Sequence, residues 1–329
     1  QWQAREAERR QQTAGAVPAG LAAGLLALAG GGAALAAFLS RWRRGYAVGA
    51  ARLVPVSEPP DATPPGLAVR LVGEGTPALA TLFDLAGRGL LRIEEGSKGR
   101  WTGRRYSLER LPLATELRPH EQGLLRALFE EKGGGMRDSL PLSEVAQRLA
   151  GRNKWYREPL DREMEEAGWV DLGRKAAGKR LMAAAVVAVL LGGAVMVAGF
   201  IVAGVSAARG AGTGAALGAV AGGAGVALLL LGIAALIAAA LFSPLAEQGL
   251  LAAAAWKGFR AYLKEVMRGR QFVAGDEAFE RYLPFAAGFG LGEQWARYFQ
   301  KKGYAVMPAW YQSLEADGSA KVRRATEIT

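Results

Sequence analysis

The sequence predicts a mainly α-helical membrane protein: three transmembrane helices, a cytoplasmic winged-helix-like α+β lobe and a C-terminal helical lobe. The first observation is that long stretches without a charged residue lie between Arg10 and Arg41, between Arg180 and Arg209, and between Arg209 and Glu247. The second is that basic residues cluster at the ends of these stretches. The third is that the remaining segments alternate apolar and polar residues as soluble helices and strands do.

These observations divide the chain into five regions. Residues 1–45 hold an N-terminal stub and the first transmembrane helix, and residues 46–75 form a Pro/Gly-rich linker that we expect to be extended and non-helical. Residues 76–175 form the winged-helix-like region, residues 176–243 a transmembrane hairpin of two helices, and residues 244–329 a cytoplasmic helical region with a tail.

The three spans are expected near residues 17–39, 181–205 and 216–242. A helix needs roughly 20 apolar residues to cross the hydrocarbon core of a bilayer, and each charge-free stretch exceeds that length. None of these spans contains Asp, Glu, Lys, Arg or His. Because ion pathways and proton relays through a membrane usually use such residues, a pump or secondary transporter is not expected.

Lysine and arginine near the span ends predict the orientation, because such residues accumulate on the cytoplasmic side. Basic clusters follow the first span, precede the second and follow the third, whereas the link between the second and third holds only Arg209. We therefore expect the N-terminus outside the plasma (inner) membrane, with residues 41–180 and the C-terminus in the cytoplasm. The basic residues Arg5, Arg9 and Arg10 are a contrary signal.

Three glycines at and just before the start of the third span, Gly214, Gly218 and Gly222, recur every four residues and so share one helix face. Such faces let helix backbones approach closely in lipid. Tight packing within the hairpin explains them, and an oligomer contact or a lipid or substrate groove is the functional alternative.

The winged-helix-like region is expected to begin at Thr76-Pro77 with a helix, followed by strands at 90–94 and 104–111. Helices at 119–131, 144–149 and 153–166 and a strand at 169–172 complete it, with Pro159 interrupting the last helix. The would-be recognition helix is net negative, and phosphate contacts dominate nucleic-acid affinity, so nucleic acid is an improbable partner. The basic, aromatic hairpin is a candidate for contact with anionic lipid headgroups through Arg100, Trp101, Arg104 and Arg105.

The C-terminal region carries aromatic motifs around Trp256, Phe259 and Tyr262, then Tyr282-Leu283-Pro284, and then Trp295. We expect Pro284 and the following glycines to break the helix there. These motifs resemble the family of predicted membrane proteins typified by YciQ, whose function is unknown. The resemblance implies a membrane topology and no activity. Because the chain starts at Gln1 and not at Met, we expect a processed product or a portion of a longer precursor. The resemblance implies a signal peptide and an extracytoplasmic β-rich domain before the first span, and we expect this chain to lack both.

The residue types present limit the chemistry. With no cysteine and one histidine, His120, the sequence offers no thiolate or histidine-cluster metal site and no base for a serine nucleophile. We therefore expect no catalytic residues, no cofactor, no metal, no small-molecule substrate and no enzyme activity. The net charge of +11 suits a positively charged cytoplasmic face.

The expected function is a membrane-anchored scaffold or signalling component, whose two cytoplasmic lobes bind each other or a protein partner. Its expected contacts are membrane lipids and either a protein partner or a second copy of the chain. The alternatives are a membrane-tethered nucleic-acid-binding protein that uses the basic hairpin, and a lipid-handling or channel-like protein built on the glycine-rich spans.

Overall fold

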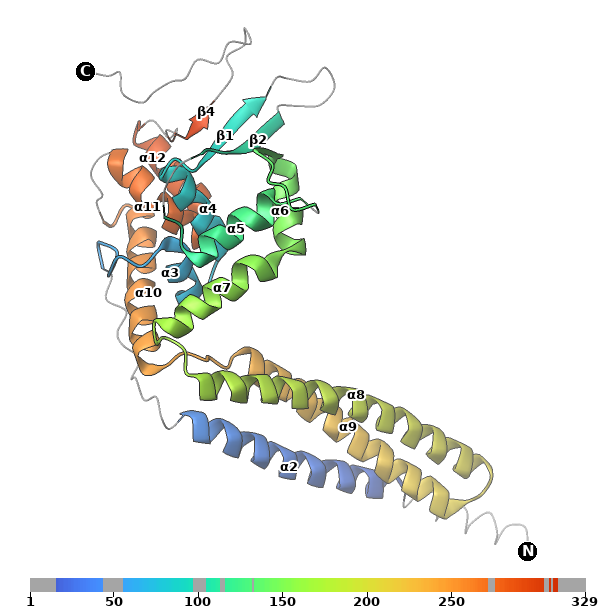
Figure 1. Ribbon diagram of the computed structural model, residues 1–329. Coiled ribbons are helices and arrows are strands. Elements are labelled where there is room, and N and C mark those ends of the chain that lie inside the picture. Colours follow the sequence, from blue (N-terminus) through green and yellow to red (C-terminus); the bar gives the residue numbers. More distant parts are fainter. Residues whose placement is uncertain are drawn as a thin grey trace, which may run out of the picture. The chain divides into compact units, whose positions relative to one another are not determined.

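The computed structural model describes residues 16–43, 56–96, 105–112, 116–131, 133–271, 276–304, 308 and 310–312. The chain folds into two compact units, each built from segments that are distant in sequence (Figure 1). The first unit comprises Gln1–Ala47 and Asp171–Leu245, and the second comprises Val48–Val170 and Ala246–Thr329.

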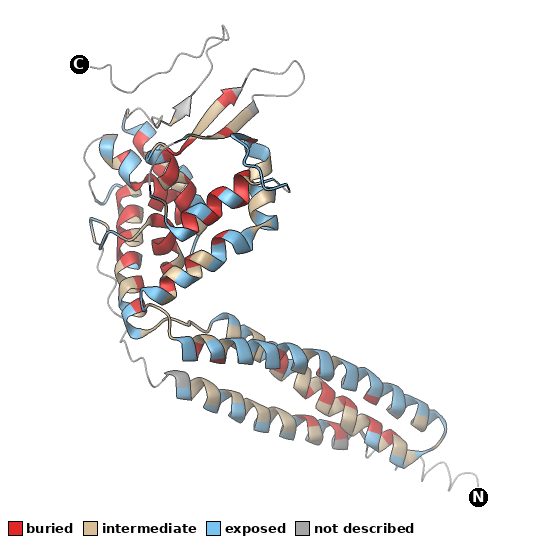
Figure 2. Cartoon of the chain, viewed as in Figure 1, coloured by how far each residue is buried: buried red, intermediate tan, exposed pale blue. Residues whose placement is uncertain are grey.

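The first unit is a bundle of three long apolar helices, α2 (Ala16–Arg43), α8 (Leu172–Ala208) and α9 (Gly212–Ala240), each long and apolar enough to cross a membrane. The three predicted spans are therefore confirmed as helices. Large apolar side chains such as Leu25, Leu190 and Phe200 are exposed along them (Figure 2). In a bilayer that exposed surface contacts lipid tails, as a spanning helix requires.

Helix α8 begins earlier than the sequence predicted, and the strand expected at 169–172 is wrong. Asp171 is the N-cap of α8, and its carboxylate accepts a hydrogen bond of 3.0 Å from the Arg174 backbone N–H. A capping aspartate satisfies one of the free N–H groups of a first helical turn and so fixes where a helix starts. Leu172 consequently opens the helix, and the boundary expected at 175/176 moves to 170/171.

The second unit contains eight helices and a four-stranded sheet among the described residues. Its helices are α3 (Pro65–Val72), α4 (Pro77–Gly87), α5 (Pro119–Phe129), α6 (Leu142–Gly151), α7 (Asn153–Glu166), α10 (Glu247–Met267), α11 (Asp276–Gly288) and α12 (Gly292–Lys301). Its strands are β1 (Leu91–Gly96), β2 (Arg105–Arg110), β3 (Ser139–Pro141) and β4 (Tyr311–Gln312). The sheet order is β3-β2-β1-β4, with β4 parallel to β1 and the other pairs antiparallel.

The interpretation of residues 46–75 as a non-helical linker is wrong for the part that the structure describes. Pro64 and Pro65 start α3 instead of preventing a helix, since a proline at the first helical position lacks only an N–H that would be unpaired there. Leu67, Val69 and Leu71 of α3 are buried, so this short helix belongs to the core of the second unit.

Two internal prolines that were expected to break helices do not. Pro159 lies within α7 and Pro284 within α11. Pro159 cannot donate a hydrogen bond to the carbonyl of Trp155, four residues earlier. That carbonyl faces α5 at Gly123, where an added Cβ would lie only 2.2 Å from the oxygen. Helix α7 nevertheless continues through Pro159, and α5 approaches closely at that carbonyl.

The second unit contains both soluble lobes that the sequence predicted. Helices α10 and α11, from the C-terminal segment, pack against α3 and α4, from the segment between the first two spans. Buried side chains therefore run continuously through both segments (Figure 2). The two predicted lobes form one compact body.

Candidate functional site: the joint between the two soluble segments

The joint between the two segments of the second unit is centred on Gly75 and Gly288. The Thr76 backbone N–H donates a 2.7 Å hydrogen bond to the Gly288 carbonyl. A Cβ added to Gly75 would lie 2.1 Å from that carbonyl oxygen, and one added to Gly288 would lie 2.5 Å from the Ala80 Cβ. Both glycines are thus needed for α4 and α11 to approach so closely.

Further contacts extend the joint on either side of these glycines. Arg260 of α10 forms an ion pair with Glu74, just before α4. The Ile93 backbone N–H in β1 donates to the Trp310 carbonyl at 3.0 Å, and the Phe83 and Trp310 rings meet edge to face with centroids 5.4 Å apart. The C-terminal segment thereby contributes both helices and a strand to the body that the first segment begins.

The two segments also meet next to the points where the chain enters and leaves the helix bundle. The Ala246 backbone N–H donates to the Trp169 carbonyl at 2.9 Å. A Cβ on Gly249 would lie 2.2 Å from the same carbonyl, so glycine is required for this contact. The ends that flank the hairpin are therefore held together by main-chain interactions.

The aromatic motif residues of the C-terminal region form the core beside the joint. Trp256 stacks on Phe285 with centroids 5.2 Å apart, and Phe259 packs edge to face against Tyr282 at 5.4 Å. Trp295 is fully buried, and its Nε1–H donates to the Phe279 carbonyl at 3.2 Å. The remaining motif residues, Tyr262, Leu283 and Pro284, are also buried. These side chains stabilise the fold and leave little surface for a ligand.

A buried polar cluster lies between α4, α5 and α7. Glu163 accepts hydrogen bonds at Oε1 from the His120 backbone N–H at 2.9 Å, and the His120 Nδ1 lies 2.8 Å from the same oxygen. Glu121, also buried, pairs with Arg88 at 2.7 Å. Burial raises the pKa of the Asp84 carboxyl, and the nearby Arg88 opposes that rise. The ion pairs satisfy these charges internally, as a structural network does.

His120 Nε2 is buried and has no hydrogen-bond partner in the described part of the chain. The Tyr156 ring lies edge to face with the imidazole at 6.2 Å, and the Tyr156 hydroxyl lies 3.0 Å from the Thr81 hydroxyl. Burial raises the pKa of Tyr156, so its hydroxyl stays protonated. No group of three or more His, Cys, Asp or Glu side chains placed to hold a metal ion occurs among the residues described.

In the helix bundle, the glycine face of α9 lies against α8. A Cβ on Gly218 would lie 2.3 Å from the Ala203 backbone nitrogen, and one on Gly222 would meet the Phe200 ring at 3.1 Å. Gly214 lies against Ser206. A second α9 face, at Gly223, is equally close to α2 at Gly20. The glycines therefore occupy helix–helix contacts within the chain.

Of the hairpin residues expected to touch lipid, Arg100, Trp101 and Arg104 lie outside the described residues. The backbone of Arg105 opens β2, but its side chain also lies outside that description. Lipid contact by this hairpin stays a prediction. The sequence did not identify Gly75 and Gly288 as the contact between the two lobes, because each glycine is explained only by the backbone that approaches it.

The family comparison covers most of the chain. Residues 52–299 match the model described as the C-terminal domain of a predicted membrane protein (DUF2207), which spans both segments of the second unit and the hairpin between them. This confirms the membership in a family of predicted membrane proteins that the sequence motifs indicated. No curated protein matches the chain, and no solved structure does.

Proposed function

Because the chain belongs to the DUF2207 family of predicted membrane proteins, we propose that it is a membrane-anchored scaffold or signalling component with no chemistry of its own. In this proposal the second unit is a cytoplasmic protein-binding body and the three apolar helices are its anchor in the plasma (inner) membrane.

The single observation that carries this proposal is the joint. Two segments that the chain separates by a transmembrane hairpin fold into one body through Gly75, Gly288 and their neighbours. That body is covalently connected to the bundle at three places in the chain: after α2, before α8 and after α9. A soluble body that is joined to its anchor at three places in the chain suits a protein that presents a surface or relays a change in the helices.

The length of α8 supports the cytoplasmic placement. Its 37 residues extend about 55 Å at 1.5 Å per residue, whereas the hydrocarbon core is about 30 Å thick. Arg174, Lys175, Lys179 and Arg180 lie in the first three turns, so the helix has enough length to keep them outside the hydrocarbon. At the base of the hairpin, the Arg174 Nε–H donates to the Ser243 carbonyl at 3.2 Å. This basic end is the cytoplasmic end by the positive-inside rule.

We place the partner contact at Trp155 on α7. This tryptophan is 39% exposed, and the guanidinium groups of Arg126 and Arg152 lie over its ring, with their central carbons 5.3 and 5.2 Å from the ring centroid. Tryptophan and arginine are the residues most enriched among those that dominate protein–protein binding energy. The two arginines hold the indole in place, which lowers the entropy that a partner must remove on binding.

Crosslinking mass spectrometry of the protein in native membranes tests the proposal. Crosslinks from Lys154, next to Trp155, to another polypeptide are expected, and Trp155→Ala should remove most of them. Met136→Ala is the matched control, because it removes an apolar side chain of similar exposure (38%) from the same unit. Crosslinks confined to one chain, or equal loss in both variants, would count against a protein-binding role.

A nucleic-acid role has one topological observation in its favour. Helix α5, strand β3 and helices α6 and α7 follow one another as in a helix-turn-helix unit, and the β1–β2 hairpin pairs with β3 as a wing would. The hairpin precedes these helices in the chain, so the winged-helix-like interpretation requires a changed element order. Salt-dependent retention of the intact protein on DNA or RNA would favour this role, and no retention at low salt would remove it.

The lipid-handling or channel alternative draws on the α9 glycines. Their close contacts with α8 and α2 leave less room for a groove there, which favours the scaffold.

A further inference from the structure

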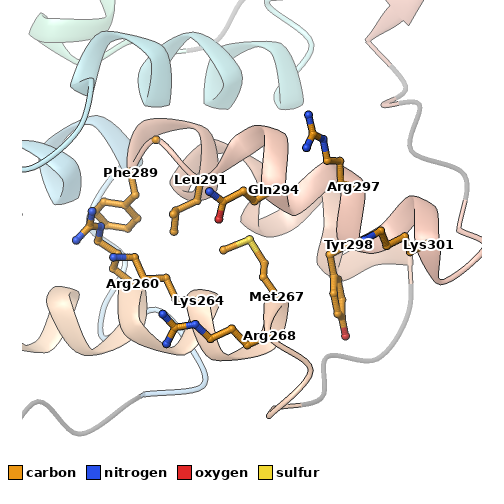
Figure 3. A pocket seen from close by; sticks show the side chains of 11 residues that line it. Arg260, Lys264, Met267, Arg268, Phe289, Leu291, Gln294, Arg297, Tyr298 and Lys301 are labelled. Atoms are coloured by element: carbon orange, nitrogen blue, oxygen red, sulfur yellow. The ribbon is translucent and has the colours of Figure 1, made fainter.

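A basic groove lies between the C-terminal half of α10, the turn that joins α11 to α12, and α12 itself (Figure 3). Its volume is about 520 Å³, within the range of small-molecule sites. Five basic side chains line it, namely Arg260, Lys264, Arg268, Arg297 and Lys301. Among the described residues that line it there is no aspartate or glutamate.

The arginines and lysines of this groove differ in how their charges are balanced. Arg260 pairs with Glu74, Arg268 with Glu265 at 2.8 Å, and Arg297 with Glu293. The ion pairs of the described residues include no acidic partner for Lys264 or Lys301. The groove therefore carries uncompensated positive charge, and a concave surface of one sign concentrates the field that attracts a counter-ion.

Other groups in the groove can complement an anion that is attached to a larger molecule. Gln294 contributes a side-chain amide and Tyr298 an aromatic ring with a hydroxyl, and both come from α12 (Figure 3).

We propose that this groove binds a phosphate-bearing ligand, with Lys264 and Lys301 as its principal cationic contacts. Phosphate groups combine several negative charges with several acceptor oxygens, and lysine and arginine are the side chains that bind them most strongly. This site is independent of the Trp155 surface on α7. The same chemistry is present in a soluble phosphorylated molecule and in the headgroup of an anionic phospholipid.

The test uses the full chain in phosphatidylcholine nanodiscs. In the first arm, inorganic pyrophosphate is titrated by calorimetry into the wild type and into the double variant Lys264→Met/Lys301→Met. Methionine keeps the length and apolar stem of lysine and removes the charge. The matched control is Lys257→Met/Lys302→Met, which makes the same charge change at exposed positions of α10 and the end of α12 that do not line the groove.

The groove variant is expected to bind pyrophosphate at least about tenfold more weakly than the wild type, because two charged contacts are lost, while the control changes about twofold or less. A second arm adds phosphatidic acid to the nanodiscs and measures by native mass spectrometry how much of it each variant retains. Loss of pyrophosphate binding in the groove variant alone supports the site with a soluble ligand. Loss of phosphatidic acid alone supports it with a lipid headgroup. Equal loss in both double variants, or no binding of either probe, overturns the proposal.

Discussion

Replacing Gly75 with alanine is expected to weaken the joint between the two soluble segments severely. Gly75 has φ +109°, a backbone conformation that costs an L-residue roughly 1–2 kcal/mol. The new methyl group would also lie 2.1 Å from the Gly288 carbonyl oxygen. Relieving that clash requires movement of α4 or α11, and overpacking of this kind costs about 1–3 kcal/mol. The expected loss is therefore about 2–5 kcal/mol out of the roughly 5–15 kcal/mol typical of a domain.

Gly73→Ala is the matched control for this prediction. Gly73 also has positive φ, +76°, but a Cβ there would meet nothing within 4 Å. The control should therefore lose only the conformational term, about 1–2 kcal/mol. The two variants make the same chemical change two positions apart, so their difference isolates the contact with Gly288.

Tryptophan fluorescence during chemical unfolding of the detergent-solubilised protein measures both variants. Trp256 and Trp295 are fully buried in the C-terminal segment, whereas Gly75 lies in the other segment. The fluorescence combines the signals of all eight tryptophans. A lower unfolding midpoint in Gly75→Ala than in Gly73→Ala is the expected result. Equal midpoints for the two variants would refute the reasoning, since they would show that the Gly75–Gly288 approach does not contribute to stability.

Three further results are expected. Gly218→Val should separate α8 from α9 and lower the stability of the bundle in detergent by about 1–3 kcal/mol in thermal unfolding. The control Gly204→Val should change little, because a Cβ at Gly204 would have nothing within 4 Å. Equal effects of the two variants would contradict the packing described. Trp295→Phe should lower the free energy of chemical unfolding by about 1–3 kcal/mol, because it removes the indole N–H that donates to the buried Phe279 carbonyl. A near-neutral effect would contradict a contribution of that hydrogen bond. The pKa of the Asp84 carboxyl is raised in the folded state, so the folded protein holds the proton of this carboxyl more tightly than the unfolded chain does. The contribution of Asp84 to the free energy of unfolding is therefore greatest below the pKa of the unfolded chain, and it decreases as pH rises through the pKa of the folded state. In unfolding experiments above pH 4, Asp84→Asn should therefore become progressively more favourable relative to wild type, and a constant difference would contradict the effect of burial.

The sequence predicted the features that depend on local composition. The three spans follow directly from long apolar runs without charge, because the cost of placing a charge in a bilayer is large and independent of the rest of the fold. Helix α5 and the β1–β2 hairpin were also predicted within a few residues, since their apolar periodicity and flanking glycines are local signals. The aromatic motifs were recognised from sequence, and the structure places them in the core.

The features that the sequence did not predict depend on contacts between distant residues. Pro65 and Pro159 were interpreted as helix-breaking, yet one starts α3 and the other is accommodated where α5 approaches at Gly123. The meeting of Gly75 with Gly288 has no local signature, because each glycine is explained only by the backbone of the other segment. The basic groove likewise combines lysines from two helices whose adjacency depends on the turn between α11 and α12.

Cysteine crosslinking tests most directly whether the two soluble segments form one body. The chain has no native cysteine, so Glu74→Cys and Arg260→Cys place the only two thiols at the ion pair that bridges the segments. After treatment with a short bismaleimide, a protease site inserted at the turn between α8 and α9 is cut and the products are separated in SDS. If the two segments form one body, the two halves migrate as one crosslinked species, whereas either single-cysteine variant gives separate halves. Separate halves from the double-cysteine protein would contradict the claim.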